Sequence, residues 1–200
     1  MLISGKNVTV PDLLKAEADV KADPIYGPEG EIIKNALLKF PMNTDREIVA
    51  MKICLIDYTN STNLAKFKRR VPLTKLVDII TGIKDFDQQV LEGKEELVEN
   101  IALQTKEAGD NLFSFASKYC CYHNYYCYHR DDYSIFDRVL MNHLVDYDEN
   151  ANPKTIKMLK DECRYREYKD VITTILNRNH IVLANRRRLF DYLVRYYNKE

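Results

Sequence analysis

Apolar residues recur at helical spacing along most of this chain, and this pattern constrains the fold more than any other feature. A T-x-x-E capping box at Thr44 and Glu47 is followed by apolar side chains at Ile48, Met51 and Leu55. Similar stripes follow Pro72 and extend over residues 87–103, whereas β-like runs are short. We therefore predict a mostly α-helical protein with a core of two helical lobes and little or no β structure.

The first 43 residues differ from the rest because they contain four of the six prolines in the chain. The segment PIYGPEGE at 24–31 combines two of these prolines with two glycines, a composition typical of turns. We expect an irregular N-terminal arm over 1–43 with one short helix near 11–20, followed by a single helical domain over 44–200.

The N-terminal residues lack the apolar run of a signal peptide, and no window of the sequence approaches a membrane span. The five cysteines form an odd set without the spacing of a disulfide framework. These features predict a cytoplasmic protein with free thiols and no contact with a membrane.

Formal net charge is zero, but the charge is distributed unevenly. Residues 151–200 carry twelve Lys and Arg against six acids, whereas residues 76–110 carry nine acids against three bases. Basic clusters of this kind can follow a phosphate backbone even on a neutral protein, although solvated basic faces explain each cluster alone equally well. The candidates for contact with a nucleic-acid backbone are Lys66, Lys68, Arg69, Arg70, Arg186, Arg187 and Arg188.

One lysine and one aspartate stand nineteen positions apart in the aromatic stretch 113–140, at Lys118 and Asp137. A lysine in an apolar helix loses hydration, which lowers its pKa and frees the amine to attack an electrophilic carbon. A nearby carboxylate can stabilise positive charge or move a proton. A lysine whose stem lies along a core helix and an aspartate that caps a helix would look the same in sequence.

The segments Ser117-Lys118-Tyr119 and Ser134-Ile135-Phe136-Asp137-Arg138-Val139 together resemble the helix-hairpin-helix DNA glycosylases, in the branch similar to 8-oxoguanine DNA glycosylases. In that family a lysine follows a hairpin on a helix, and an aspartate follows about twenty residues later in a short apolar segment. The resemblance covers residues 113–140 and implies a helical glycosylase-like domain.

The resemblance implies a glycosylase with β-lyase activity, acting on double-stranded DNA that contains an 8-oxoguanine-like base. Lys118 would form a Schiff base with the sugar, and Asp137 would assist. The damaged base would be flipped out of the duplex into a pocket with aromatic walls. No cofactor is expected. The expected substrate-binding residues are Phe113, Phe115, Tyr119, Phe136 and Arg138.

A second group in the same stretch has the residue types that bind zinc. It consists of Cys120, Cys121, His123, Cys127 and His129. Structural zinc sites usually draw ligands from two separated pairs, whereas these residues are crowded into ten positions. We therefore favour buried thiols and loop histidines and expect no metal.

Two further functions remain open. Arg138 and His143 have an R-x4-H spacing that resembles HEPN-type ribonucleases, in which the histidine would act as general base on a ribose hydroxyl. Fourteen tyrosines and no tryptophan also suit a non-catalytic helical module that binds a nucleic acid or a protein, although no protein partner can be named.

Overall fold

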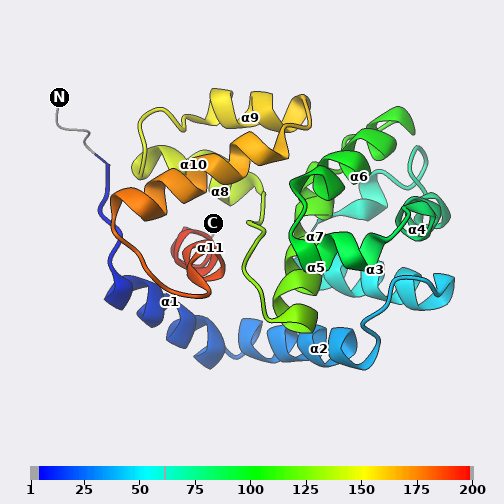
Figure 1. Ribbon diagram of the computed structural model, residues 1–200, viewed down its shortest axis with the longest axis horizontal. Helices are drawn as coiled ribbons and strands as arrows, with labels where there is room; N and C mark the ends of the chain where they lie inside the picture. Colours follow the sequence, from blue (N-terminus) through cyan, green and yellow to red (C-terminus); the bar gives the residue numbers. More distant parts are fainter. Residues whose placement is uncertain (1–4, 61, 199–200) are drawn as a thin grey trace.

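The computed structural model describes residues 5–60 and 62–198, and this part of the chain is built from α-helices, with no strand (Figure 1). The prediction of a mostly α-helical protein is therefore confirmed. The helices are α1 Val10–Ala22, α2 Tyr26–Lys39, α3 Arg46–Asn60, α4 Leu73–Gly82, α5 Phe86–Glu92, α6 Glu95–Glu107, α7 Phe113–Tyr128, α8 Arg138–His143, α9 Pro153–Asp161, α10 Tyr165–Arg178 and α11 Arg186–Tyr197, with 3-10 turns at Leu64–Lys66 and Leu144–Asp146.

The N-terminal segment is not the irregular arm that we expected, because its described part contains two helices. The expected helix near 11–20 is α1, which begins at a reciprocal capping box between Thr9 and Asp12. The second helix, α2, was not predicted, because Pro28 was interpreted as part of a turn. That proline falls in the first turn of α2, where a backbone N–H would have no partner within the helix. Asp23 supplies the local cap, since its Oδ1 accepts the N–H groups of Ile25 and Tyr26.

The capping box predicted at Thr44 and Glu47 is displaced by one residue. Asp45 Oδ1 accepts the Ile48 N–H at 2.9 Å, so Asp45 is the residue that caps α3. The helix itself forms as expected and continues to Asn60.

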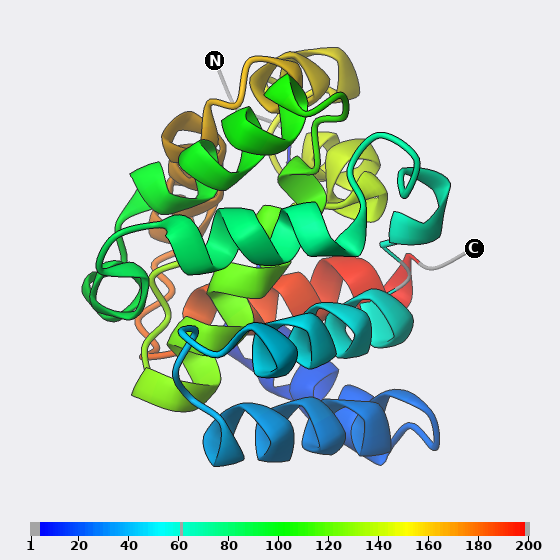
Figure 2. The ribbon, with the colours of Figure 1, turned by 90° about the vertical axis from the view of Figure 1, so that its right-hand side faces the viewer.

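Helix α7 runs through the middle of the protein and is buried along nearly its whole length. It packs against α2, α3, α5 and α6 (Figures 1 and 2). A helix that is apolar on all sides is expected when neighbours surround it, which explains why the stretch 113–128 is so rich in aromatic residues and cysteine. Any function carried by α7 therefore takes place inside the protein rather than on an open face.

Residues 129–137 cross from the end of α7 to the start of α8 without regular structure, and side chains of the helices bind their backbone. Tyr165 Oη accepts the Ser134 N–H and donates to its carbonyl, while Tyr168 Oη donates to the Ile135 carbonyl. Asp191 accepts the Ile135 N–H at 3.1 Å. These bonds satisfy a buried irregular backbone and fix the direction in which the segment enters α8.

The C-terminal helix α11 packs against α1, α8 and α10. It is seen nearly end-on in Figure 1 and lengthwise in Figure 2. None of the helices in the described part of the chain combines the length and the apolar character that a membrane span requires.

Candidate active site

Lys118 lies in the second turn of α7, and only 2% of it is exposed. Its amine has two long polar contacts, to the Asn60 carbonyl at 3.5 Å and to Ser114 Oγ at 3.4 Å. Both distances exceed those of a strong hydrogen bond from an ammonium group. The amine is therefore buried without the close contacts that would stabilise its charged form.

The environment lowers the pKa of the Lys118 amine to about 8. Burial is the largest cause, and the positive charge of Arg195 lowers the pKa further, while Asp137 and two more distant carboxylates act in the opposite direction. A substantial fraction of the amine is consequently neutral near physiological pH. This is the form that can act as a nucleophile.

Asp137 is the N-cap of α8, and its Oδ1 accepts the Leu140 N–H at 3.0 Å. Its Oδ2 lies 2.6 Å from Nε of Arg195. Burial alone would raise the pKa of Asp137, but the charges of Arg195 and Lys118 and the Leu140 N–H together hold it below its usual range. Asp137 is therefore a carboxylate inside the protein.

Arg195 of α11 completes the cluster, and the sequence analysis did not identify it. Its Nη2 also lies 3.4 Å from Asn60 Oδ1, so Asn60 contacts both cationic side chains. Arg188, Asp191 and Arg195 recur at helical spacing on α11, and Arg188 and Asp191 face the core. Charged residues at this spacing on the inward face of an amphipathic helix are the sequence feature that could have indicated a buried charged site.

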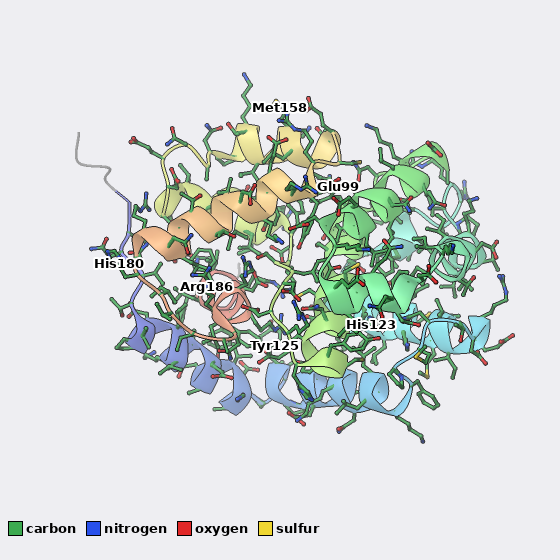
Figure 3. All side chains as sticks on the ribbon, viewed as in Figure 1. Glu99, His123, Tyr125, Met158, His180 and Arg186 are labelled. Atoms are coloured by element: carbon green, nitrogen blue, oxygen red, sulfur yellow. The ribbon has the colours of Figure 1, made fainter. Side chains whose placement is uncertain are left out.

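A small cavity of about 70 Å³ opens beside this cluster, between α2, α7 and α11. A larger hollow of about 390 Å³ adjoins it and shares Val20, Tyr26, Gly30 and Tyr192. Tyr125, which lines the larger hollow, lies between α7 and α11 in Figure 3. Lys118 does not line the small cavity, whose lining comprises Val20, Tyr26, Glu29, Gly30, Ile33, Thr59, Asn60, Tyr122, Arg188, Tyr192, Arg195 and Tyr196.

The aromatic residues expected to bind substrate all lie in the core. The Phe113 and Phe136 rings meet edge to face at 5.1 Å, and the Phe115 and Tyr119 rings pack at 5.5 Å. Each of the four is at most 3% exposed. The structure thus gives these rings a packing role, whereas Arg138 is exposed at the start of α8.

The two basic clusters lie well apart in the fold (Figure 1). The side chains of the cluster at 66–70 are exposed, and Arg70 is paired with Asp110. In the other cluster, Arg186 and Arg187 are partly buried, and Arg188 is only 4% exposed. The run of three arginines therefore does not form one open basic face.

The cysteines and histidines of α7 are not arranged as a metal site. Cys120 and Cys121 are buried thiols, and Nδ1 of the buried His123 lies 2.8 Å from the Tyr119 carbonyl. Burial lowers the pKa of His123 to about 3, so its ring is neutral. Across residues 5–60 and 62–198, no group of three or more His, Cys, Asp or Glu side chains is placed to hold a metal ion.

Arg138 and His143 occupy the two ends of α8. Five positions on an α-helix correspond to a rotation of about 140°, so the two side chains leave the helix in different directions. His143 lies 3.5 Å from Asp146, and Arg138 is exposed at the first position of the helix.

The fold and the buried lysine, aspartate and arginine define a helical protein with an internal ionised cluster beside a tyrosine-lined cavity. The chain belongs to the HI_0787_N family, described as an N-terminal domain, whose match covers residues 12–132. Lys118 and Asn60 lie within the matched residues, whereas Asp137, Arg188 and Arg195 follow them. Comparison with curated proteins and with solved structures finds no match.

Proposed function

We propose that the protein is a DNA glycosylase with β-lyase activity, in which Lys118 is the nucleophile and Asp137 its carboxylate partner. The observation that supports this best is the Lys118 amine, which is buried, weakly hydrogen-bonded and lowered in pKa to about 8 within a cluster that contains an ionised aspartate. Amine and carboxylate are the two groups that such a reaction requires of the protein.

In the first step the neutral Lys118 amine attacks C1′ of the nucleotide that carries the damaged base. The bond between C1′ and the base nitrogen breaks, and the base leaves with the electron pair and takes up a proton. The attacking nitrogen loses a proton, the bond between C1′ and the ring oxygen breaks, and that oxygen takes up a proton. This leaves a protonated Schiff base between Lys118 Nζ and C1′. Asp137 stabilises the positive charge that develops on the sugar.

In the second step a proton leaves C2′, and the bond from C3′ to its oxygen breaks, which releases the strand on the 3′ side with a 5′-phosphate end. Water then hydrolyses the Schiff base and regenerates the Lys118 amine. These two reaction steps require no oxidant, reductant or metal. Side chains of the protein and water are therefore sufficient for the chemistry.

Access to Lys118 requires movement around Asn60. The Asn60 carbonyl contacts the amine, and its side chain bonds the Tyr122 hydroxyl and lines the small cavity. A nucleotide that approaches from this side has to widen the cavity and displace the Asn60 side chain before it reaches the amine. Residues 108–112 form the turn that precedes α7. We propose no DNA contact there, because the N–H groups of Gly109, Asp110 and Leu112 already donate to acceptors within the protein.

The proposal is tested with duplexes that contain 8-oxoguanine or an abasic site, by measuring strand cleavage and covalent trapping with borohydride. We expect cleavage and trapping by the native chain and by Lys52→Gln, and neither by Lys118→Gln. Lys52 is a suitable control because it is also fully buried and also has a pKa lowered to about 8. Its amine, however, is bonded to the Met42 carbonyl and to Asn43. Binding of DNA without cleavage would instead favour a non-catalytic module.

A further inference from the structure

The Arg188 guanidinium is a buried positive charge whose nitrogens lack partners. Only 4% of the residue is exposed, and neither Nε nor Nη1 has a hydrogen-bond partner. Among the described residues, no carboxylate lies within ion-pair distance of this group. Buried polar groups are nearly always satisfied, so unpaired donors beside a cavity call for an explanation.

The acidic side chains whose charges act on Arg188 form no ion pair with its guanidinium. The two Asp131 oxygens accept the backbone N–H groups of Arg187 and Arg188, Asp191 Oδ2 accepts the Ile135 N–H, and the buried Asp191 Oδ1 has no hydrogen-bond partner. The second arginine of the cavity, Arg195, is paired with Asp137. Arg188 is therefore the cation at this cavity whose charge the protein leaves uncompensated at short range.

Tyrosine rings surround Arg188 on several sides. Its central carbon lies 4.3 Å from the ring centre of Tyr192, 4.8 Å from that of Tyr122 and 5.9 Å from that of Tyr125. Aromatic faces attract a guanidinium and can hold it away from water, but they do not accept its N–H groups as a planar oxyanion does. The rings thus orient the fork of donors without accepting its hydrogen bonds.

We propose that Arg188 and the tyrosines around it form a binding site for a phosphate group of a nucleotide. An arginine fork matches the oxygens of a phosphate, and the cavity of about 70 Å³ that Arg188 lines suits one small anion rather than a whole nucleoside. The adjoining hollow of about 390 Å³ has the size of an ordinary ligand pocket and is lined by Tyr26, Tyr125, Tyr126 and Tyr192. Tyrosine rings provide surfaces on which a base can stack.

The lining of the cavity also includes one negatively charged side chain, which opposes the binding of an anion and provides a second variant for the experiment. Glu29 is the acidic residue among those that line the cavity, and a carboxylate there weakens the binding of an anion. Loss of the Glu29 charge and loss of the Arg188 charge should therefore change affinity in opposite directions. A purely structural role of these side chains would not produce opposite changes.

The experiment measures binding by calorimetry in a buffer free of phosphate and sulfate. The probes are inorganic phosphate, a nucleoside 5′-monophosphate and a short single-stranded oligonucleotide, which separate a free nucleotide from a strand as the source of the phosphate. We expect Arg188→Gln to weaken the binding of the preferred probe by at least about tenfold, since one charge-assisted fork is lost. Glu29→Gln should strengthen binding, and Tyr192→Leu should weaken it.

Arg186→Gln is the matched control, because Arg186 lies on the same helix and its Nη1 bonds the Asn177 side chain and the Ile181 carbonyl. It should bind as the native chain does. Equal affinity of Arg188→Gln and the native chain, or no binding of any probe, overturns the proposal. Tyr192 is only partly buried, so its variant keeps the test decisive if Arg188→Gln fails to fold. Lys118→Gln should retain binding, which distinguishes a failure of this site from a failure of the proposed catalysis.

Discussion

Arg195 Nε lies 2.6 Å from Asp137 Oδ2, and the two side chains are only 17% and 12% exposed. The pair joins the C-terminal helix α11 to the N-cap residue of α8. Asp137 also caps α8 through its bond to the Leu140 N–H. The same carboxylate therefore stabilises the start of this helix and neutralises the charge of a buried arginine. The position of the Asp137 carboxylate is thereby fixed from two sides.

Replacing Arg195 by Met is expected to lower the free energy of unfolding by about 3 kcal/mol, because it leaves Asp137 buried without its partner. Urea unfolding followed by circular dichroism measures the loss. Arg138→Met is the control, since Arg138 is adjacent in sequence but exposed. Equal stability of the two variants would show that the buried pair contributes nothing.

Covalent trapping should become faster as pH rises through about 8. The pKa of Lys118 is lowered to about 8, so the neutral amine that attacks the sugar predominates only above that pH. Because Asp137 raises the pKa of Lys118, the Asp137→Asn variant should shift the midpoint to lower pH. Initial trapping rates between about pH 6 and about pH 10 test both statements. A rate independent of pH would contradict them.

Asp191→Asn should make stability less dependent on pH. Burial raises the pKa of Asp191 to about 8, against the opposing effects of Arg188, the Ile135 N–H and Arg195. The folded state therefore keeps a proton that the unfolded chain releases above about pH 4, and this contribution to stability is lost as pH rises through about 8. Relative to the native chain, the free energy of unfolding of the variant should rise by on the order of 4 kcal/mol between about pH 5 and about pH 8 in urea unfolding. Parallel pH profiles would refute the assignment.

Tyr119→Phe should affect stability and leave trapping unchanged. The Tyr119 hydroxyl donates to Asn43 Oδ1 at 2.6 Å within the core, so its removal should cost about 1 kcal/mol. Thermal unfolding and trapping assays on the same preparation separate the two effects. A loss of trapping without a loss of stability would restore Tyr119 to the substrate-binding residues that the sequence suggested.

The fold class could be predicted because apolar periodicity depends on local sequence, and most of the helices were found in this way. Helix α2 was missed because Pro28 and two glycines are typical of a turn, whereas the cap at Asp23 and the first-turn position of Pro28 permit a helix. The last turns of α7 are polar and rich in tyrosine, so in sequence they resemble a loop until their burial is known.

The sequence suggested Lys118 and Asp137 as a pair from their spacing and their apolar surroundings, and this pair stays a prediction, but nothing in the sequence linked Arg195 to Asp137. Arg195 lies far along the chain, and only packing of α11 beside α8 brings it to Asp137. The run of three arginines at 186–188 suggested a solvated basic face. A helix turns successive residues in different directions, however, and Arg188 is the one that turns inward.

The most direct test of the central claim is to locate the site of the trapped adduct. A duplex with an abasic site is reduced with borohydride in the presence of the native chain, and the digested protein is sequenced by mass spectrometry. We expect the sugar remnant on Lys118 and on no other lysine, including the buried Lys52. A remnant on another residue, or no adduct under conditions in which the chain is folded, would contradict the proposed lyase.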